Sequence, residues 1–156
     1  MNTPGRILLL LAAGCSAVVA LLHVAILLVG PPWYRWFGAS SLAQQIESGS
    51  ALGPTLLTLA VAALFVVWTG YGLSGAGVIR RLPLLRVGLY VIAAIYVLRG
   101  VQVLLEVPAA VHGRMPARFA VFSAFSALAG AAYLVGALRS GRSGRPPSTH
   151  AARSQL

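Results

Sequence analysis

Four long stretches of apolar residues constrain this chain more than any other feature. They run roughly over residues 7–30, 51–79, 87–105 and 119–138. A helix needs about 20 mostly apolar residues to cross a bilayer core about 30 Å thick, and each stretch reaches or approaches that length. An unpaired backbone group is costly in lipid, so each stretch is expected to be helical. The sequence therefore predicts an all-α polytopic membrane protein, an antiparallel bundle of four transmembrane helices.

Composition leaves no room for a separate soluble domain. Only 9% of the 156 residues are charged, whereas soluble domains carry about 25%. We expect one transmembrane domain over residues 1–139, with spans at about 7–30, 51–77, 85–106 and 118–138. Residues 140–156 are rich in Ser, Gly, Pro and Arg, a composition typical of disorder, and are predicted to form a basic cytoplasmic tail.

The net charge is +10, and all twelve basic residues are arginines. An inside N-terminus places eight of them on inner segments and three on outer ones, which favours N-in and C-in topology by the positive-inside rule. The inner set is Arg6, Arg80, Arg81, Arg86, Arg139, Arg142, Arg145 and Arg153, and the outer set is Arg35, Arg114 and Arg118. Arginines at the ends of spans indicate anionic lipid headgroups at the cytoplasmic face as partners. No nucleic-acid-binding motif is present, so nucleic acid is not expected.

Cys15 allows an alternative interpretation of the first apolar stretch. Arg6 followed by nine residues that end in Ala13-Gly14-Cys15 resembles a bacterial lipoprotein signal, in which the cysteine is acylated after cleavage. A cleavable signal has an apolar region of only about 7–15 residues, but here the apolar run continues to Gly30. We therefore expect an intact first helix. A single cysteine also excludes an intramolecular disulfide.

Local signals set the expected helix ends. Pro31 and Pro32 should end the first helix, and Pro108 should end the third after Glu106, because proline lacks the backbone donor that continues a helix. In the loop between the first two spans, residues 41–47 predict a short interfacial helix capped by Ser40 or Ser41.

Arg99 is a charged residue inside a span, a position that is costly to insert. It lies seven residues before Glu106, and Tyr96, Gln102 and Glu106 fall on the same helical stripe. We expect Arg99 and Glu106 to form an ion pair at the mouth of a pocket. The alternative is that Arg99 only extends outward to the headgroups in a structural ion pair.

His23 lies at a similar depth, seven residues before Gly30. Thr58 and Ser126 are also about seven residues from the outer ends of their spans, about 10 Å along a helix. All four spans thus offer polar groups at one level. The sequence predicts an outward-facing polar pocket with these candidate binding residues: His23, Thr58, Tyr96, Arg99, Gln102, Glu106 and Ser126.

The sequence lacks the residues that several kinds of site require. A single histidine with no second histidine or cysteine at its depth argues against a metal or haem site, so no metal ligand is proposed and any cofactor is unknown. The chain has no Asp and only two Glu, far apart in sequence, which argues against paired-carboxylate catalysis. The glycines of residues 70–77 lack the strand-turn-helix context of a phosphate loop.

Two segments, Gly30–Gly38 and Leu73–Gly77 before Arg80, resemble those of uncharacterised small four-helix inner-membrane proteins of bacteria. The resemblance implies a bacterial inner-membrane location but does not indicate an activity. The abundance of Ala, Gly, Leu and Arg without Lys is also typical of a GC-rich bacterial genome.

We expect a non-enzymatic membrane protein that binds a small amphipathic or anionic ligand, lipid-like or quinone-like, because such ligands fit an apolar cavity with few polar groups. One alternative is a membrane-embedded enzyme that uses His23 as acid or base. Another is a subunit or assembly factor that packs against a membrane-protein partner or a second copy of the chain.

Overall fold

The computed structural model describes residues 3–142, and every regular element in that range is a helix. Four segments are long and apolar enough to cross a membrane: Pro4–Val29, Leu52–Gly75, Leu85–Val111 and Arg118–Ser140. The expected all-α fold with four membrane-spanning helices is confirmed, and the chain is a multi-pass membrane protein. The elements are α1 (Thr3–Val29), α2 (Pro31–Trp36), α3 (Ser40–Glu47), α4 (Leu52–Gly75), α5 (Leu85–Val101), α6 (Val103–Val111) and α7 (Arg118–Arg142).

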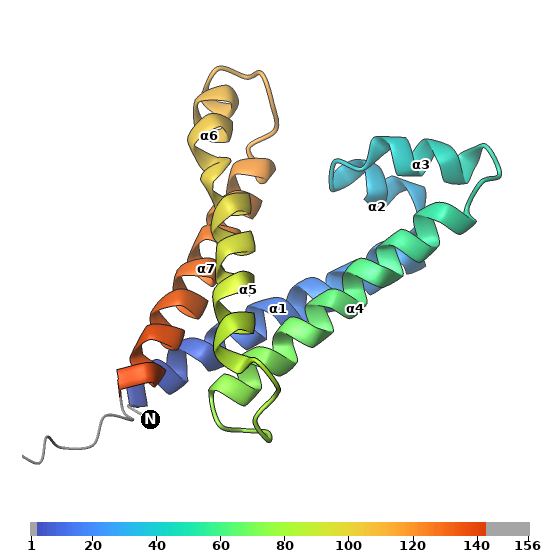
Figure 1. Ribbon diagram of the computed structural model, residues 1–156. Helices are drawn as coiled ribbons and strands as arrows, with labels where there is room; N and C mark the ends of the chain where they lie inside the picture. The colour runs from blue at the N-terminus through green and yellow to red at the C-terminus, as the bar shows by residue number, and fades with distance from the viewer. Residues whose placement is uncertain (1–2, 143–156) are drawn as a thin grey trace, which may run out of the picture.

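The long helices associate as two antiparallel pairs. Helix α1 packs along α4, α5 packs along α7, and α1 also contacts α7. In Figure 1 the pairs meet near the end that carries the N-terminus and diverge toward the end that carries α2, α3 and α6. Contacts between α4 and α5 are sparser than those within either pair. This arrangement leaves space between the pairs for a cavity.

Small residues allow the helices of each pair to approach closely. A Cβ atom at Gly100 of α5 would lie 2.6 Å from the Cα atom of Ala127 in α7, and one at Gly72 of α4 would lie 2.8 Å from the Cβ atom of Ala13 in α1. Association of helices in lipid relies on such packing, because burial of apolar surface gives little gain there. The small residues of the spans therefore pack against other helices of this chain.

A buried chain of hydroxyl groups joins all four long helices. The Ser16 Oγ atom in α1 is 3.0 Å from the hydroxyls of both Tyr96 in α5 and Tyr133 in α7. The Tyr133 hydroxyl donates to the carbonyl oxygen of Trp68 in α4 at 2.9 Å. Because a carbonyl only accepts, Ser16 donates to Tyr133 and Tyr96 donates to Ser16. The hydroxyls of Ser16, Tyr96 and Tyr133 therefore all have hydrogen-bond partners.

The segment between α1 and α4 folds into the two short helices α2 and α3. The interfacial helix expected at residues 41–47 is confirmed as α3. Its expected serine cap is wrong: Ala39 occupies the cap position with no side-chain hydrogen bond, and Ser40 and Ser41 lie within the helix. Backbone bonds from Leu42 and Ala43 to the Ala39 carbonyl close the first turn instead.

The third span does not stop before Pro108, as the sequence suggested. It breaks at Gln102 and continues as α6 to Val111 with Pro108 inside the helix. The Gln102 carbonyl accepts hydrogen bonds from Leu105 and Glu106, so the helix restarts at once. Pro108 then removes only one backbone bond, and membrane-spanning helices tolerate such a proline.

The first helix is intact, as expected, whereas the last helix is longer than expected. Helix α1 runs unbroken through Cys15, which is half-buried against the core. Helix α7 extends to Arg142, into the segment expected to be a tail. The remainder of that predicted tail, residues 143–156, lies outside the described residues.

Candidate functional site

A cavity of about 660 Å³ lies between the two helix pairs. Trp68 and Tyr96 of the core line it toward the N-terminal end of the bundle, and Phe37 and Phe122 line it toward the end that carries α2. Small-molecule sites are typically about 300–1,000 Å³, mostly apolar, with a few placed polar groups. Four of the seven predicted site residues line this cavity: His23, Tyr96, Arg99 and Ser126.

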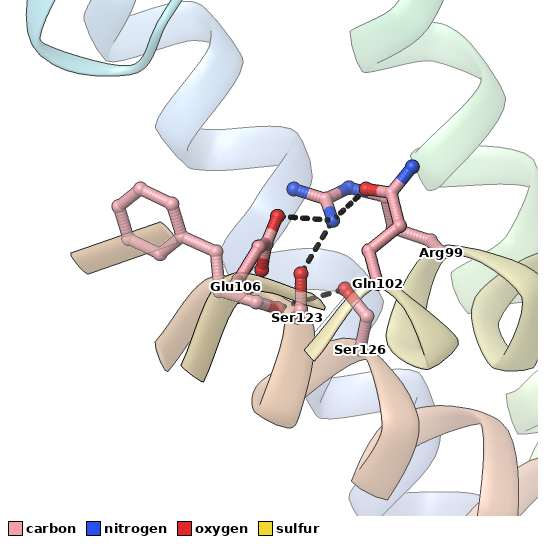
Figure 2. A network of polar contacts seen from close by, with 6 residues as sticks. Arg99, Gln102, Glu106, Ser123 and Ser126 are labelled. Carbon is pink, nitrogen blue, oxygen red and sulfur yellow. Dashed lines mark hydrogen bonds and ion pairs between the residues drawn. The ribbon is translucent and has the colours of Figure 1, made fainter. Parts of the chain in front are cut away.

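Arg99 occupies the last turn of α5, next to the break at Gln102. Its Nη1 atom donates to Gln102 Oε1 and to Ser123 Oγ, each at 2.5 Å, and lies 3.6 Å from Glu106 Oε1 (Figure 2). All of these contacts fall on one nitrogen. Among the described residues, the Nε and Nη2 atoms have no hydrogen-bond partner. The side chain is 42% exposed, so two of the three guanidinium nitrogens remain available to a ligand.

Glu106 completes the polar cluster from the first turn of α6. The expected ion pair with Arg99 is confirmed, although its separation is longer than a good hydrogen bond. Glu106 is only 12% exposed, and its buried Oε2 atom has no hydrogen-bond partner among the described residues. An unpaired buried acceptor is unfavourable by about 1–3 kcal/mol. The pair therefore leaves unused hydrogen-bonding capacity on both partners.

His23 presents one ring nitrogen to the cavity side of α1. Its Nδ1 atom is 2.8 Å from the carbonyl oxygen of Val19, which can only accept, so Nδ1 carries the proton. The ring stacks on Phe65 with centroids 5.5 Å apart. Nε2 has no hydrogen-bond partner among the described residues. In the neutral ring Nε2 is a hydrogen-bond acceptor. The cavity therefore offers an acceptor from His23 and donors from Arg99.

Aromatic rings and aliphatic side chains form the wall of the cavity between these polar groups. Phe65, Trp68 and Tyr96 contact one another with centroids between 4.8 and 6.1 Å apart. Their mutual edge and tilted contacts are favourable geometries for aromatic pairs. The wall fixes the shape of the cavity and gives a flat ligand ring or an acyl chain an apolar surface.

The outer rim is closed by contacts between α2 and α7. Phe37 stacks on Phe122 with centroids 5.5 Å apart, and the Nε atom of Arg118 donates to the Trp36 carbonyl at 2.9 Å. The Arg118 guanidinium also lies 5.4 Å from the centroid of the Trp36 ring, a cation-π distance. These contacts join the two helix pairs where they otherwise diverge.

The other three predicted residues occupy different places. Gln102 and Glu106 belong to the Arg99 cluster but do not line the cavity themselves. Thr58 is buried with its hydroxyl 2.8 Å from both Tyr34 and the Pro54 carbonyl. Its hydrogen-bonding capacity is thus used between α2 and α4. The structure brings Thr58 into the packing of the loop and not into the cavity lining.

Sequence reasoning missed two parts of the site. Ser123 is fully buried and bonded to Arg99 but is not among the predicted site residues. Phe65, Trp68 and Phe122 line the cavity and carry no polar signal in the sequence. The signal that would have identified Ser123 is its position one turn before Ser126 on α7.

No group of three or more potential metal-ligating side chains occurs within residues 3–142. The chain matches no family model, no curated protein and no solved structure. The functional argument therefore rests on the cavity and its polar groups.

Proposed function

We propose that this protein is a non-enzymatic integral membrane protein that binds a small amphipathic, lipid-like ligand with an anionic group in the cavity beside Arg99. The observation that carries the proposal is the position of Arg99: a guanidinium that lines an apolar cavity with two nitrogens unpaired among the described residues. A guanidinium binds carboxylates and phosphates through paired donors. A charged residue within a span is costly to insert, and binding of an anionic ligand accounts for its presence there.

The other polar groups support the same ligand class. His23 Nε2 is an acceptor for a ligand hydroxyl, and Tyr96 and the aromatic wall offer apolar surface to a ring or chain. Glu106 holds Arg99 loosely at 3.6 Å, so an incoming anion competes with a weak contact. In this account Glu106 retains Arg99 while the cavity is empty.

We also propose that the protein resides in a bacterial inner membrane with both termini inside. In the structure Arg6, Arg81 and Arg86 border a single cleft at the end that carries the N-terminus. Arg35, Arg114 and Arg118 belong to the opposite end. This asymmetry supports N-in and C-in orientation by the positive-inside rule, and it makes the Arg99 cavity face outward.

An enzyme that uses His23 as acid or base is the second candidate, favoured by the unpartnered Nε2 atom. A general base also needs a positioned reaction partner, and the nearest ring to His23 is the unreactive Phe65. The subunit or assembly-factor hypothesis has less support, because small residues of the spans such as Gly72 and Gly100 already pack against helices of this chain.

Photocrosslinking of a matched probe pair tests the proposal. The purified protein in phosphatidylcholine vesicles is exposed to a diazirine-bearing fatty acid or to the fatty alcohol of the same chain, and labelled peptides are mapped by mass spectrometry. The acid should label cavity segments, residues 18–26 and 121–126, above lipid-facing segments. Arg99→Leu should reduce that labelling about tenfold, the loss expected for a hydrogen bond to a charged group of about 1.5–3 kcal/mol.

Two controls make the result decisive. Arg99→Lys retains the charge without the planar fork and should bind with intermediate strength, and Arg114→Leu removes an arginine from the loop before α7 and should change nothing. If acid and alcohol label the same peptides equally in wild type and in Arg99→Leu, the anionic-ligand proposal is wrong.

A further inference from the structure

A second cavity, here called the basic cleft, lies at the opposite end of the bundle from the Arg99 cluster. Its volume is about 960 Å³, and the start of α1, the end of α4, the start of α5 and the end of α7 border it. Three exposed arginines line it: Arg6, Arg81 and Arg86. The fold brings Arg6 of α1 together with Arg81 and Arg86, which lie five residues apart between the end of α4 and the first turn of α5.

No side-chain carboxylate can neutralise this charge. The chain contains only two acidic residues. Glu47 pairs with Arg35 and Glu106 pairs with Arg99, both at the far end of the bundle. The arginines of the basic cleft therefore need anions from outside the chain. At a membrane surface the abundant anions are lipid headgroups, which attract basic residues.

The connection between α4 and α5 is held in place beneath the cleft. The Ser74 hydroxyl is buried, donates to the Arg80 carbonyl at 3.0 Å and accepts from the Leu82 amide at 2.9 Å. The Tyr71 hydroxyl donates to the Pro83 carbonyl at 3.2 Å. These bonds fix the backbone on both sides of Arg81, so its charge is presented from a defined position.

Apolar side chains border the arginines and distinguish a lipid from a free anion. Ile79, Leu84 and Val87 line the same cleft and are exposed. Leu84 is 76% exposed and adopts a left-handed backbone with φ of 51°, a conformation uncommon for leucine. Inorganic phosphate gains nothing from this apolar border, whereas an acyl chain does.

We propose that the basic cleft is a binding site for an anionic phospholipid. The phosphate contacts Arg6, Arg81 and Arg86, and the proximal part of an acyl chain lies against Ile79, Leu84 and Val87. This site is separate from the Arg99 cavity and does not depend on the function proposed for it.

Native mass spectrometry of the full chain in mild detergent tests this site. The protein is mixed with equal amounts of phosphatidylglycerol and phosphatidylcholine that carry the same acyl chains. Wild type should retain phosphatidylglycerol preferentially. Arg81→Gln and Arg86→Gln should each lower that retention about fivefold, the equivalent of about 1 kcal/mol per basic residue. Arg114→Gln makes the same charge change outside the cleft and should retain the wild-type preference.

A further variant separates lipid from free phosphate. Leu84→Asn keeps a residue that tolerates the left-handed backbone but removes the apolar contact, and it should also lower retention. Inorganic phosphate at the lipid concentration should displace nothing. Equal retention of the two lipids, equal loss in Arg114→Gln, or displacement by inorganic phosphate would each overturn the proposal. Circular dichroism and gel filtration confirm that the variants are folded.

Discussion

Arg99 and Glu106 face each other across the break between α5 and α6, with the Arg99 Nη1 atom 3.6 Å from the Glu106 Oε1 atom. The contact is looser than the bonds from the same nitrogen to Gln102 and Ser123. Glu106 therefore balances the charge of Arg99 without occupying its other donors. This relationship allows a membrane helix to carry a guanidinium that is partly free to bind a ligand.

Replacement of Glu106 tests how much the ion pair stabilises the fold. Glu106→Gln should lower the free energy of unfolding by no more than about 1 kcal/mol, because the ion pair is long, Arg99 is 42% exposed, and loss of the charge also reduces the cost of burying the Oε2 atom that has no partner among the described residues. Ligand binding should persist, since Arg99 keeps Gln102 and Ser123. Thermal unfolding in detergent measures the change, and a loss several times larger would show that the pair is a structural anchor.

Ser16 tests the hydroxyl chain that joins the helices. Ser16→Ala removes the acceptor of the buried Tyr96 hydroxyl, whereas Tyr133 keeps the Trp68 carbonyl. Loss of a buried partner should lower stability by about 1–3 kcal/mol. Ser126→Ala is the matched control, because the Ser126 hydroxyl donates only to the Phe122 carbonyl of its own helix. Equal Tm values for the two variants would contradict the proposed cross-linking role.

Gly100 tests the close approach of α5 and α7. A Cβ atom there would lie 2.6 Å from both the Cα and N atoms of Ala127, so backbone must move. Gly100→Ala should lower stability by about 1–3 kcal/mol, as overpacking does. Gly14→Ala introduces the same methyl group in α1 where nothing lies within 4 Å, and it should be neutral or slightly stabilising. Comparable losses in both variants would refute the packing argument.

Reporter fusions test the proposed orientation. Fusions after Gly77 and after Arg139 should report a cytoplasmic location, and a fusion after Glu47 should report a periplasmic one. The reason is the excess of arginines on the segments assigned to the inside. A periplasmic signal at Arg139 would reverse the orientation and place the Arg99 cavity on the cytoplasmic side.

The four spans could be predicted from sequence because insertion in lipid depends on local apolar length. The ion pair of Arg99 and Glu106 was also predictable, since spacing along one helix defines a face. The pairing of α1 with α4 and of α5 with α7 was not, because it depends on which small residues meet across helices.

The errors at Thr58 and Pro108 have the same origin. Depth along a span placed Thr58 beside Arg99, but Tyr34 folds back from α2 and takes its hydroxyl. The missing backbone donor of proline predicts a helix end before Pro108, but the break lies at Gln102 and the helix continues through Pro108 to Val111. Local spacing gives the depth and face of a residue, whereas its partner is set by tertiary packing.

Mass spectrometry of the small molecules that copurify with the protein in mild detergent tests the central claim most directly. Wild type should carry an amphipathic molecule with a carboxylate or a phosphate. Arg99→Leu should lose it while its Tm stays near that of wild type, because removal of a charge from a span offsets the loss of its contacts. Wild-type occupancy of every copurifying molecule in Arg99→Leu would contradict the account and leave Arg99 as a structural residue that extends toward the headgroups.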